Sequence, residues 1–207
     1  MKIYDLRTDT ITKPSDEMRR AIYEAECGDD VYMEDLTVNK LQEMSAEITG
    51  KEKSIFVASG TMGNLIPLLI LGSKTKQMLL DEESHIMHYE LGGASSLAGI
   101  MPLTVKADRG ILTKKTIENY FKEQPYYMTK INIVEIENTH NRHGGSVYKI
   151  DILKELYKFV KSKNIHLHMD GARVFNASIS SKTSVKDIAS NTDSITFCLS
   201  KGLGAPM

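Results

Sequence analysis

The sequence is poor in several residue types that mark specialised proteins. Its 207 residues contain two cysteines, no tryptophan and five prolines, and aromatic residues make up 7% of the chain. Cys27 and Cys198 are too few for the disulfide framework of a small secreted domain, so we expect a reducing, cytoplasmic location. The net charge of −1 excludes the strong basic field that nucleic-acid binding requires.

Long apolar runs are also missing. The longest, residues 65–71, is interrupted by Pro67 and is far shorter than the roughly 20 residues of a membrane span. The first ten residues carry charges where a signal peptide has its apolar segment. Hydrophobic residues at 41% and charged residues at 26% are typical of a globular domain with a sizeable core. We therefore expect neither a nucleic acid nor a membrane as partner.

Short apolar runs typical of strands alternate with patterns typical of helices. This alternation predicts a three-layer α/β fold, with a mostly parallel sheet and ligands at the carboxyl ends of its strands. Pro14 is expected to begin a helix, Gly50 to end one, and Asp151 to cap another. The predicted strands are Ser54–Ala58, Gln77–Leu80, Met101–Val105, Ile131–Ile136, His166–Met169 and Ser194–Leu199. The predicted helices are Asp16–Glu26, Leu36–Thr49, Met62–Leu71, His88–Ala98, Thr113–Lys122, Ile150–Lys163 and Val185–Ala189.

A glycine-rich segment, Ser59–Gly63, lies between a predicted strand and a predicted helix. Gly60 lets backbone amides approach an anion at the helix N-terminus, and the hydroxyl of Thr61 adds a donor. The segment therefore suggests a phosphate site. The alternative is a turn that uses glycine only for its conformation.

Two polar segments follow the last predicted strands. Asp170 ends one strand, where a carboxylate could pair with a protonated pyridine nitrogen, and Arg173 could hold a carboxylate with two hydrogen bonds. Lys201 follows the next strand between serine and glycine, with room to form a Schiff base. The alternatives are a helix-capping aspartate, a solvent-facing arginine and a surface lysine.

Histidines raise further possibilities. His85 follows a predicted strand and could stack on an aromatic cofactor, with Tyr89 one helical turn later, although either side chain could simply be solvated. His166, His168 and Asp170 share one face of a strand, which would suit a metal. Two other histidine pairs are spaced i, i+3: His85 and His88, and His140 and His143. Because no cysteine or carboxylate cluster completes a closed site, we predict no metal.

Taken together, the motifs resemble the threonine aldolase family of pyridoxal-phosphate (PLP) enzymes. The family has the aspartate-aminotransferase fold, or fold type I, which the resemblance implies for this chain. Each motif is weak by itself, but the ordered set is specific and spans nearly the whole chain. The segments that carry the resemblance are Asp5–Thr10, Gly28–Tyr32, Ser59–Asn64, Ser84–Ile86, Glu137–Asn141, Asp170–Arg173 and Ser200–Gly202.

The resemblance implies a role for each matching residue toward PLP. Lys201 corresponds to the lysine that binds the cofactor covalently, and Asp170 to the partner of its pyridine nitrogen. His85 corresponds to the ring stacked on the cofactor. Gly60 and Thr61 correspond to phosphate ligands.

The resemblance also implies a substrate site. Thr8 and Arg173 correspond to groups near the substrate carboxylate, with Arg173 also close to the cofactor hydroxyl, and Tyr89 is a further candidate. The family often has serine where this chain has Thr8. It also often has a histidine shortly before the Glu137–Asn141 segment, where this chain reads Pro125-Tyr126-Tyr127.

The implied reaction is cleavage of L-threonine or L-allo-threonine to glycine and acetaldehyde, with His85 or a bound water as base. Family members run well past the lysine, so we expect residues 1–14 to form an arm and 15–207 an incomplete large domain, without the small C-terminal domain. Family enzymes are typically homotetramers, and this chain alone is expected to have little activity. The alternatives are another fold-type I lyase that eliminates a β-substituent, and a non-catalytic remnant that associates with full-length subunits.

Overall fold

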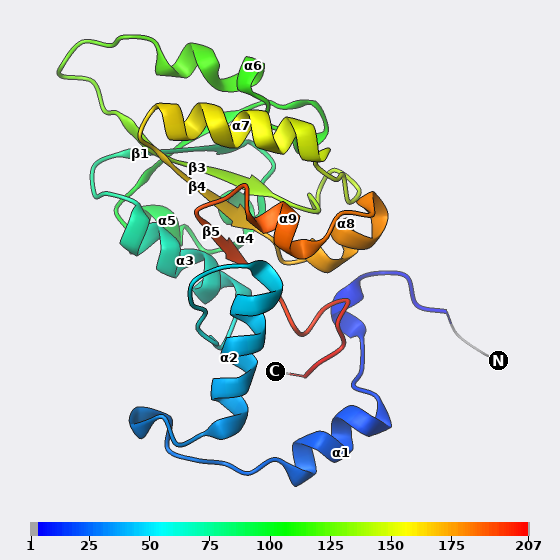
Figure 1. Cartoon of the computed structure of the whole chain (residues 1–207). Helices are drawn as coiled ribbons and strands as arrows, with labels where there is room; N and C mark the ends of the chain where they lie inside the picture. Colours follow the sequence, from blue (N-terminus) through cyan, green and yellow to red (C-terminus); the bar gives the residue numbers. More distant parts are fainter. Residues whose placement is uncertain (1–3, 207) are drawn as a thin grey trace.

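The computed structural model describes residues 4–206, and its centre is a five-stranded sheet (Figure 1). All neighbouring strands are parallel, in the order β2-β1-β3-β4-β5. The predicted α/β fold class is therefore confirmed. The strands are β1 (Gln77–Asp81), β2 (Met101–Val105), β3 (Ile131–Glu137), β4 (His166–Asp170) and β5 (Ser194–Thr196).

Helices precede the sheet and connect its strands. Within the described residues none is both long enough and apolar enough to cross a membrane. The α-helices are α1 (Asp16–Glu24), α2 (Leu36–Thr49), α3 (Gly60–Leu71), α4 (His85–Tyr89), α5 (Gly93–Ser96), α6 (Lys114–Ile117), α7 (Ile150–Ser162), α8 (Val174–Ser181) and α9 (Val185–Ala189). The 3-10 helices are η1 (Asp9–Ile11), η2 (Asp30–Tyr32), η3 (Asp108–Gly110) and η4 (Glu118–Phe121).

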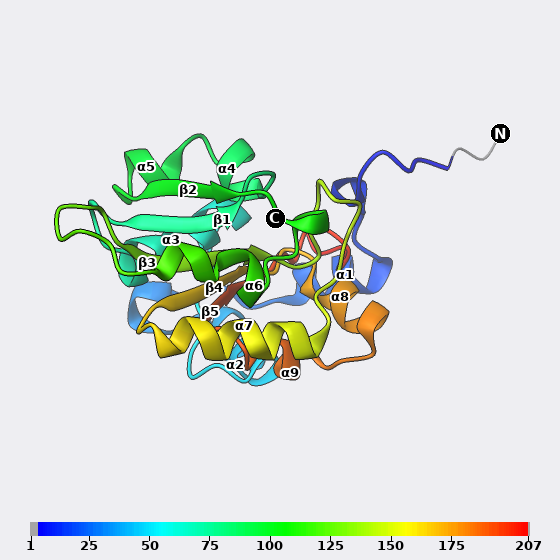
Figure 2. The same cartoon turned by 90° about the horizontal axis from the view of Figure 1, so that it is seen from above.

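Both faces of the sheet are covered by helices, as Figures 1 and 2 show. Strand side chains alternate between the two faces, so Leu79 joins the core beneath α6, α7 and α8, while Met78 and Leu80 pack with α3 and α5. Leu156 of α7 is completely buried in the first of these cores. Burying one such side chain contributes about 1.5–3 kcal/mol.

The face toward α3 becomes polar near the carboxyl ends of β3 and β4. Glu135 and Glu137 alternate with the core residues of β3, and they lie in register with His168 and Asp170 of β4. All four side chains are buried. The strand period thus builds a buried polar row where the sheet approaches its ligand-binding edge.

The helix boundaries follow capping chemistry, which corrects two of three predictions. Gly50 does end α2 in the left-handed conformation, as predicted. Pro14 does not begin α1: Ser15 caps that helix, because its hydroxyl accepts a hydrogen bond from the Met18 amide. Asp151 is not a cap either, since it lies inside the first turn of α7.

The predicted strand at Ser54–Ala58 is wrong. Those residues form no strand, and Ile55 is 68% exposed. A groove of about 680 Å³ lies between this segment and β5, with α2 and α3 also lining it. A strand needs a neighbour for its backbone hydrogen bonds, and across this groove the segment has none. β5 likewise ends at Thr196, three residues before the prediction.

Two predicted helices are broken and one was missed. Residues 88–98 divide into α4 and α5, because Leu91 and Gly92 between them adopt left-handed conformations. Residues 113–122 divide into α6 and the 3-10 helix η4. α8 had no prediction.

Candidate active site

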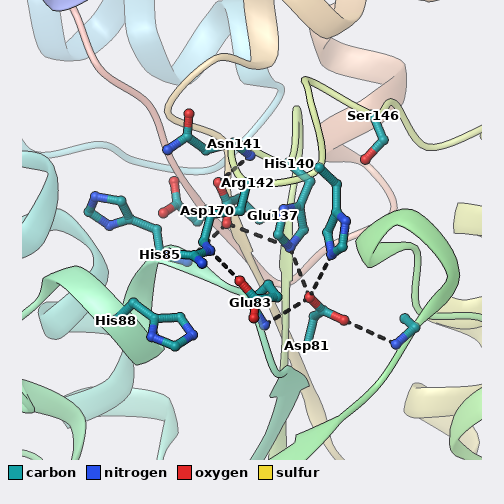
Figure 3. Close-up of polar contacts among 12 residues, drawn as sticks. Asp81, Glu83, His85, His88, Glu137, His140, Asn141, Arg142, Ser146 and Asp170 are labelled. Carbon is teal, nitrogen blue, oxygen red and sulfur yellow. Dashed lines mark hydrogen bonds and ion pairs between the residues drawn. The ribbon is translucent and has the colours of Figure 1, made fainter. Parts of the chain in front are cut away.

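Three carboxylates end three strands and meet at one edge of the sheet. Asp81, Glu137 and Asp170 end β1, β3 and β4, and each is 3–4% exposed. Figure 3 shows them grouped with the rings of His85 and His140. Parallel strands bring their carboxyl ends together, so residues far apart in the sequence form one buried cluster.

Asp170 is held firmly by two donors. Its Oδ2 accepts a hydrogen bond of 2.9 Å from the Asn64 side-chain amide, and its Oδ1 accepts one of 3.0 Å from the Ala172 backbone. These two hydrogen bonds fix the position of the carboxyl group at the strand end.

Asn64 of α3 connects the cluster. Its amide nitrogen also donates to Glu90 Oε1 at 2.8 Å, so its oxygen is the acceptor for His168 Nε2 at 3.2 Å. His168 Nδ1 must then accept from the Ser194 hydroxyl, 2.8 Å away. Burial lowers the pKa of His168 to about 4, so this imidazole is neutral at physiological pH.

His85 begins α4 beside this network. Its Nδ1 lies 2.9 Å from Glu90 Oε1, and this hydrogen bond raises the pKa of His85 against the effect of partial burial. Its backbone N–H donates to Glu137 Oε2 at 2.9 Å. The ring is 5.2 Å from that of Tyr89, whose hydroxyl accepts a hydrogen bond from Arg142. Because Nδ1 of His85 is hydrogen-bonded to Glu90, Nε2 is the ring nitrogen that can contact a ligand.

Lys201 lies in the loop after β5. The electrostatic environment of Cys198 shows that Lys201 and Asp170 are both close to the same thiol. Burial raises the pKa of the Cys198 thiol, while the charge of Lys201 lowers it and that of Asp170 raises it further. Both charges therefore lie near one thiol at the same edge of the sheet. The Thr12 hydroxyl donates to the Lys201 carbonyl at 2.7 Å, so the N-terminal segment touches the lysine loop.

Arg173 is paired with a carboxylate of the chain itself. Its Nε and Nη2 donate to Asp9 at 2.7 and 2.8 Å, which is the two-bond geometry expected for a carboxylate ligand. Neighbouring Thr8 is exposed, and its hydroxyl accepts from the Thr10 amide. The structure therefore brings Thr8 and Arg173 into one region, with Asp9 between them.

The glycine-rich segment begins α3, although no strand precedes it. Ser59 caps the helix through the Met62 amide, and Gly60 and Thr61 are its first two residues. A Cβ at Gly60 would lie 2.9 Å from Cys198 Sγ, so glycine allows the helix start to pack against the chain after β5. This N-terminus offers the geometry that anion binding uses.

Sequence reasoning missed the residues that link the site. Asn64, Glu90, Glu135 and Glu137 were given no role, although Asn64 and Glu137 lie in segments that carry the family resemblance. The possible metal set of His166, His168 and Asp170 does not form, because both ring nitrogens of His168 are used for hydrogen bonds.

The fold and the edge cluster together define a class of enzyme. A lysine, a buried carboxylate, a histidine and a helix N-terminus at the carboxyl edge of a parallel α/β sheet match the chemistry of an aromatic, phosphorylated aldehyde cofactor. The fold is that of the solved threonine aldolases, which is fold type I of the PLP enzymes. The chain belongs to the beta-eliminating lyase family, which matches residues 5–207.

Within this family, the chain is similar to threonine aldolases. It is 40% identical over 204 residues to the low specificity L-threonine aldolase of Escherichia coli, covering 98% of the chain and 60% of that protein. It is 38% identical over 211 residues to low-specificity L-threonine aldolase 1 of Arabidopsis thaliana, covering 100% of the chain and 59% of that protein. The solved threonine aldolase of Leishmania major has the same fold, with a TM-score of 0.75 and 23% identity over 90% of this chain and 55% of that one.

Proposed function

We propose that this chain carries the cofactor-binding part of a PLP-dependent aldolase that cleaves L-threonine or L-allo-threonine to glycine and acetaldehyde. The observation that supports this most is Asp170, buried at the sheet edge and fixed by the amides of Asn64 and Ala172. The chain spans about 60% of the length of its curated relatives, so the activity of the whole protein belongs to the proposal.

Five residues would hold the cofactor. Asp170 would face the ring nitrogen and keep it protonated, Lys201 would bind the aldehyde carbon, and His85 would lie against the ring. Gly60 and Thr61 would donate to the phosphate from the start of α3. When bound, PLP supplies an electron-poor ring that accepts the electrons of the broken bond.

His85 is the base that the local hydrogen bonds favour. The reaction removes the proton of the substrate β-hydroxyl, breaks the Cα–Cβ bond and releases acetaldehyde. Glu90 accepts from Nδ1 of His85, which leaves Nε2 to take that proton. The same hydrogen bond raises the pKa of His85, which strengthens the imidazole as a base near neutral pH.

Arg173 would bind the substrate carboxylate in place of Asp9. The two carboxylates would compete for the same pair of guanidinium donors, and release of Asp9 would free the N-terminal segment that carries Thr8. Tyr89, beside His85, would border the substrate side chain.

The decisive experiment is titration of the purified chain with PLP, followed by its visible absorption. The wild-type chain should develop the absorption of lysine-bound cofactor, and Lys201→Ala should lose it. Lys130→Ala is the matched control, because Lys130 is exposed and precedes β3 at the opposite edge of the sheet. Equal absorption in wild type and Lys201→Ala, or none in wild type, would contradict the proposal.

A second activity is favoured by the family match, which is described as beta-eliminating lyase. Elimination of a β-substituent would use the same lysine and carboxylate but would release ammonia after the product hydrolyses. Incubation of the PLP-loaded chain with threonine and with aromatic amino acids separates the two. Acetaldehyde and glycine indicate the aldolase, and ammonia indicates the eliminating enzyme.

We propose further that the chain works in a homo-oligomer. Large apolar side chains within residues 4–36 are exposed, among them Tyr23, Val31 and Leu36. Such a surface is typical of a subunit interface. Light scattering after size-exclusion chromatography should give a mass above the 23.2 kDa of one chain. Association only with a full-length relative, without cofactor absorption, would instead favour the non-catalytic remnant.

A further inference from the structure

A second cluster at the same sheet edge lies beside the proposed PLP site. Asp81 at the end of β1 meets two histidines of the loop that follows β3. Its Oδ1 is 3.2 Å from His140 Nε2 and 3.4 Å from His143 Nε2 (Figure 3). One carboxylate oxygen and two imidazole nitrogens therefore converge within 4.8 Å of one another.

The nitrogens of this cluster lack satisfactory hydrogen bonds. His140 is completely buried, yet neither of its ring nitrogens has a hydrogen-bond partner in the part of the chain that the structure describes. His143 Nε2 is also buried and unpartnered there. Both nitrogens lie close to Asp81 Oδ1 without forming a hydrogen bond to it. A buried polar group without a partner costs about 1–3 kcal/mol.

We propose that Asp81, His140 and His143 bind a divalent first-row metal ion, Zn²⁺ by geometry. Zinc binds imidazole nitrogen and carboxylate oxygen at about 2.0–2.2 Å in a tetrahedron, which places neighbouring ligand atoms about 3.3–3.5 Å apart. The separations of 3.2 and 3.4 Å fit this arrangement. Two histidines and one carboxylate leave the fourth position for water.

The surroundings favour a cation. Asp81, Glu90, Glu135, Glu137 and Asp170 are all buried, with at most 4% of each exposed. Glu137 Oε2 lies 3.9 Å from His140 Nε2, and Glu137 also accepts the backbone N–H groups of His85 and Asn141. A metal ion would offset the charge of the buried Asp81 carboxylate and fix the 138–146 loop beside His85.

The packing also holds the ligand ring in place. A Cβ at Gly110 would lie 2.3 Å from Cδ2 of His140, so the η3 turn closes directly over the imidazole. The sequence alone predicted no metal, because no carboxylate lies close to His140 and His143 in a pattern that would complete a site. Asp81 lies 59 positions before His140, and only the parallel pairing of β1 with β3 brings it to the loop.

The test is calorimetric titration of the tag-free chain, without PLP, with ZnCl₂. Wild type should bind one Zn²⁺ saturably, and Co²⁺ in its place should give the visible absorption of a tetrahedral nitrogen–oxygen site. His143→Asn should weaken Zn²⁺ binding at least about 10-fold, the lower bound even for loss of an outer-shell partner. His143 is partly exposed, so this variant should fold.

The matched control is His88→Asn, because His88 is an exposed histidine of α4 outside the cluster. It should bind Zn²⁺ as wild type does. Cys27→Ser in all chains removes the exposed thiol as a competing ligand. Absence of saturable binding in wild type, or equal affinity in wild type and His143→Asn, would overturn the proposal. The titration uses no cofactor, so its result is independent of the proposed lyase activity.

Discussion

The sheet and the first 59 residues of this chain are built in opposite ways. In the sheet, β1 and β3 bury four of five and five of seven residues, with helices on both faces. In residues 4–59, Thr49 alone is buried, and α1 stands away from the sheet (Figure 1). The sheet is thus a finished core, whereas the N-terminal region exposes apolar surface that suits contact with further protein.

This difference in burial indicates which part of the chain contributes most to its stability. The two apolar cores are made by the strands, their covering helices and the loops between them, with members from Leu65 onward. The N-terminal region is attached by the packing of α2 against α9 and by polar contacts, such as those of the Lys51 ammonium with the carbonyls of Ala189 and Thr192. Variants at matched residues in the two regions should therefore differ in effect.

The largest difference is expected for leucine truncation. Leu156→Ala in α7 removes a completely buried side chain and should lower the free energy of unfolding by about 2–5 kcal/mol. Leu36→Ala makes the same chemical change at a side chain that is 68% exposed, so it should cost less than about 0.5 kcal/mol. Urea unfolding of both variants measures this. Similar losses would mean that residues 4–59 are packed as firmly as the sheet.

A buried carboxyl inside the sheet should make its stability depend on pH. Burial, and then the charge of Asp170, raises the pKa of Glu135 well above its ordinary value of 4.5. Neither carboxyl oxygen has a hydrogen-bond partner within the described residues. A raised acid contributes stability below pH 4.5 that is lost as the pH rises through the folded pKa.

Glu135→Gln removes this dependence. At pH 8 it should stabilise the chain by at least about 1.4 kcal/mol, the free energy of a tenfold change in the acid dissociation constant, and below pH 4.5 the gain should vanish. Urea unfolding at several pH values measures it. A gain that stays constant with pH would show that folding does not raise the pKa of Glu135. The exposed Glu47→Gln is the control from the N-terminal region.

The same contrast explains how far the sequence predicted the fold. Periodicity found α7 and the five strands that pair, because a strand or helix with one buried face carries its pattern locally. It failed at Ser54–Ala58, where the apolar pattern is present but no neighbouring strand pairs with it. Strand formation depends on a partner that the local sequence does not contain.

The residues of the candidate site also fall into two groups, those predicted from the sequence and those found only in the structure. The strand-end rule and the family resemblance pointed to Asp170, Lys201 and His85. They gave no role to Asn64 or Glu90, although in the structure Asn64 of α3 donates hydrogen bonds to both Glu90 and Asp170. Single residues with reactive or charged side chains were predicted from the sequence. Their hydrogen-bond partners could be identified only from the folded structure.

Helix caps test whether the two regions unfold together. Asp35 caps α2 through the Val38 amide, and Ser184 caps α9 through the Asp187 amide. α2 packs against α9, so the two helices should be lost in one transition. Asp35→Ala and Ser184→Ala should therefore each lower the unfolding free energy by about 1 kcal/mol. A cost for Ser184→Ala alone would place α2 outside the cooperative unit.

The smallest effect is expected where the N-terminal segment meets the site. The Arg173 hydrogen bonds lower the pKa of Asp9 below its ordinary value of 3.8. A lowered acid contributes stability that is present above pH 3.8 and is lost as the pH falls through the folded pKa. Both side chains are partly exposed, so the pair should contribute less than about 1 kcal/mol.

Asp9→Asn should therefore speed amide hydrogen exchange in residues 8–12 at neutral pH, and wild type should approach the variant as the pH drops below 3.8. Asp5→Asn is the matched control, since Asp5 also pairs with an arginine, but with exposed Arg7 two positions along the chain and not with Arg173. Equal exchange in all three chains would mean that the Asp9–Arg173 pair does not hold this segment. The hydrogen bond from Thr12 to the lysine loop would then be the contact to test next between the N-terminal region and the proposed active site.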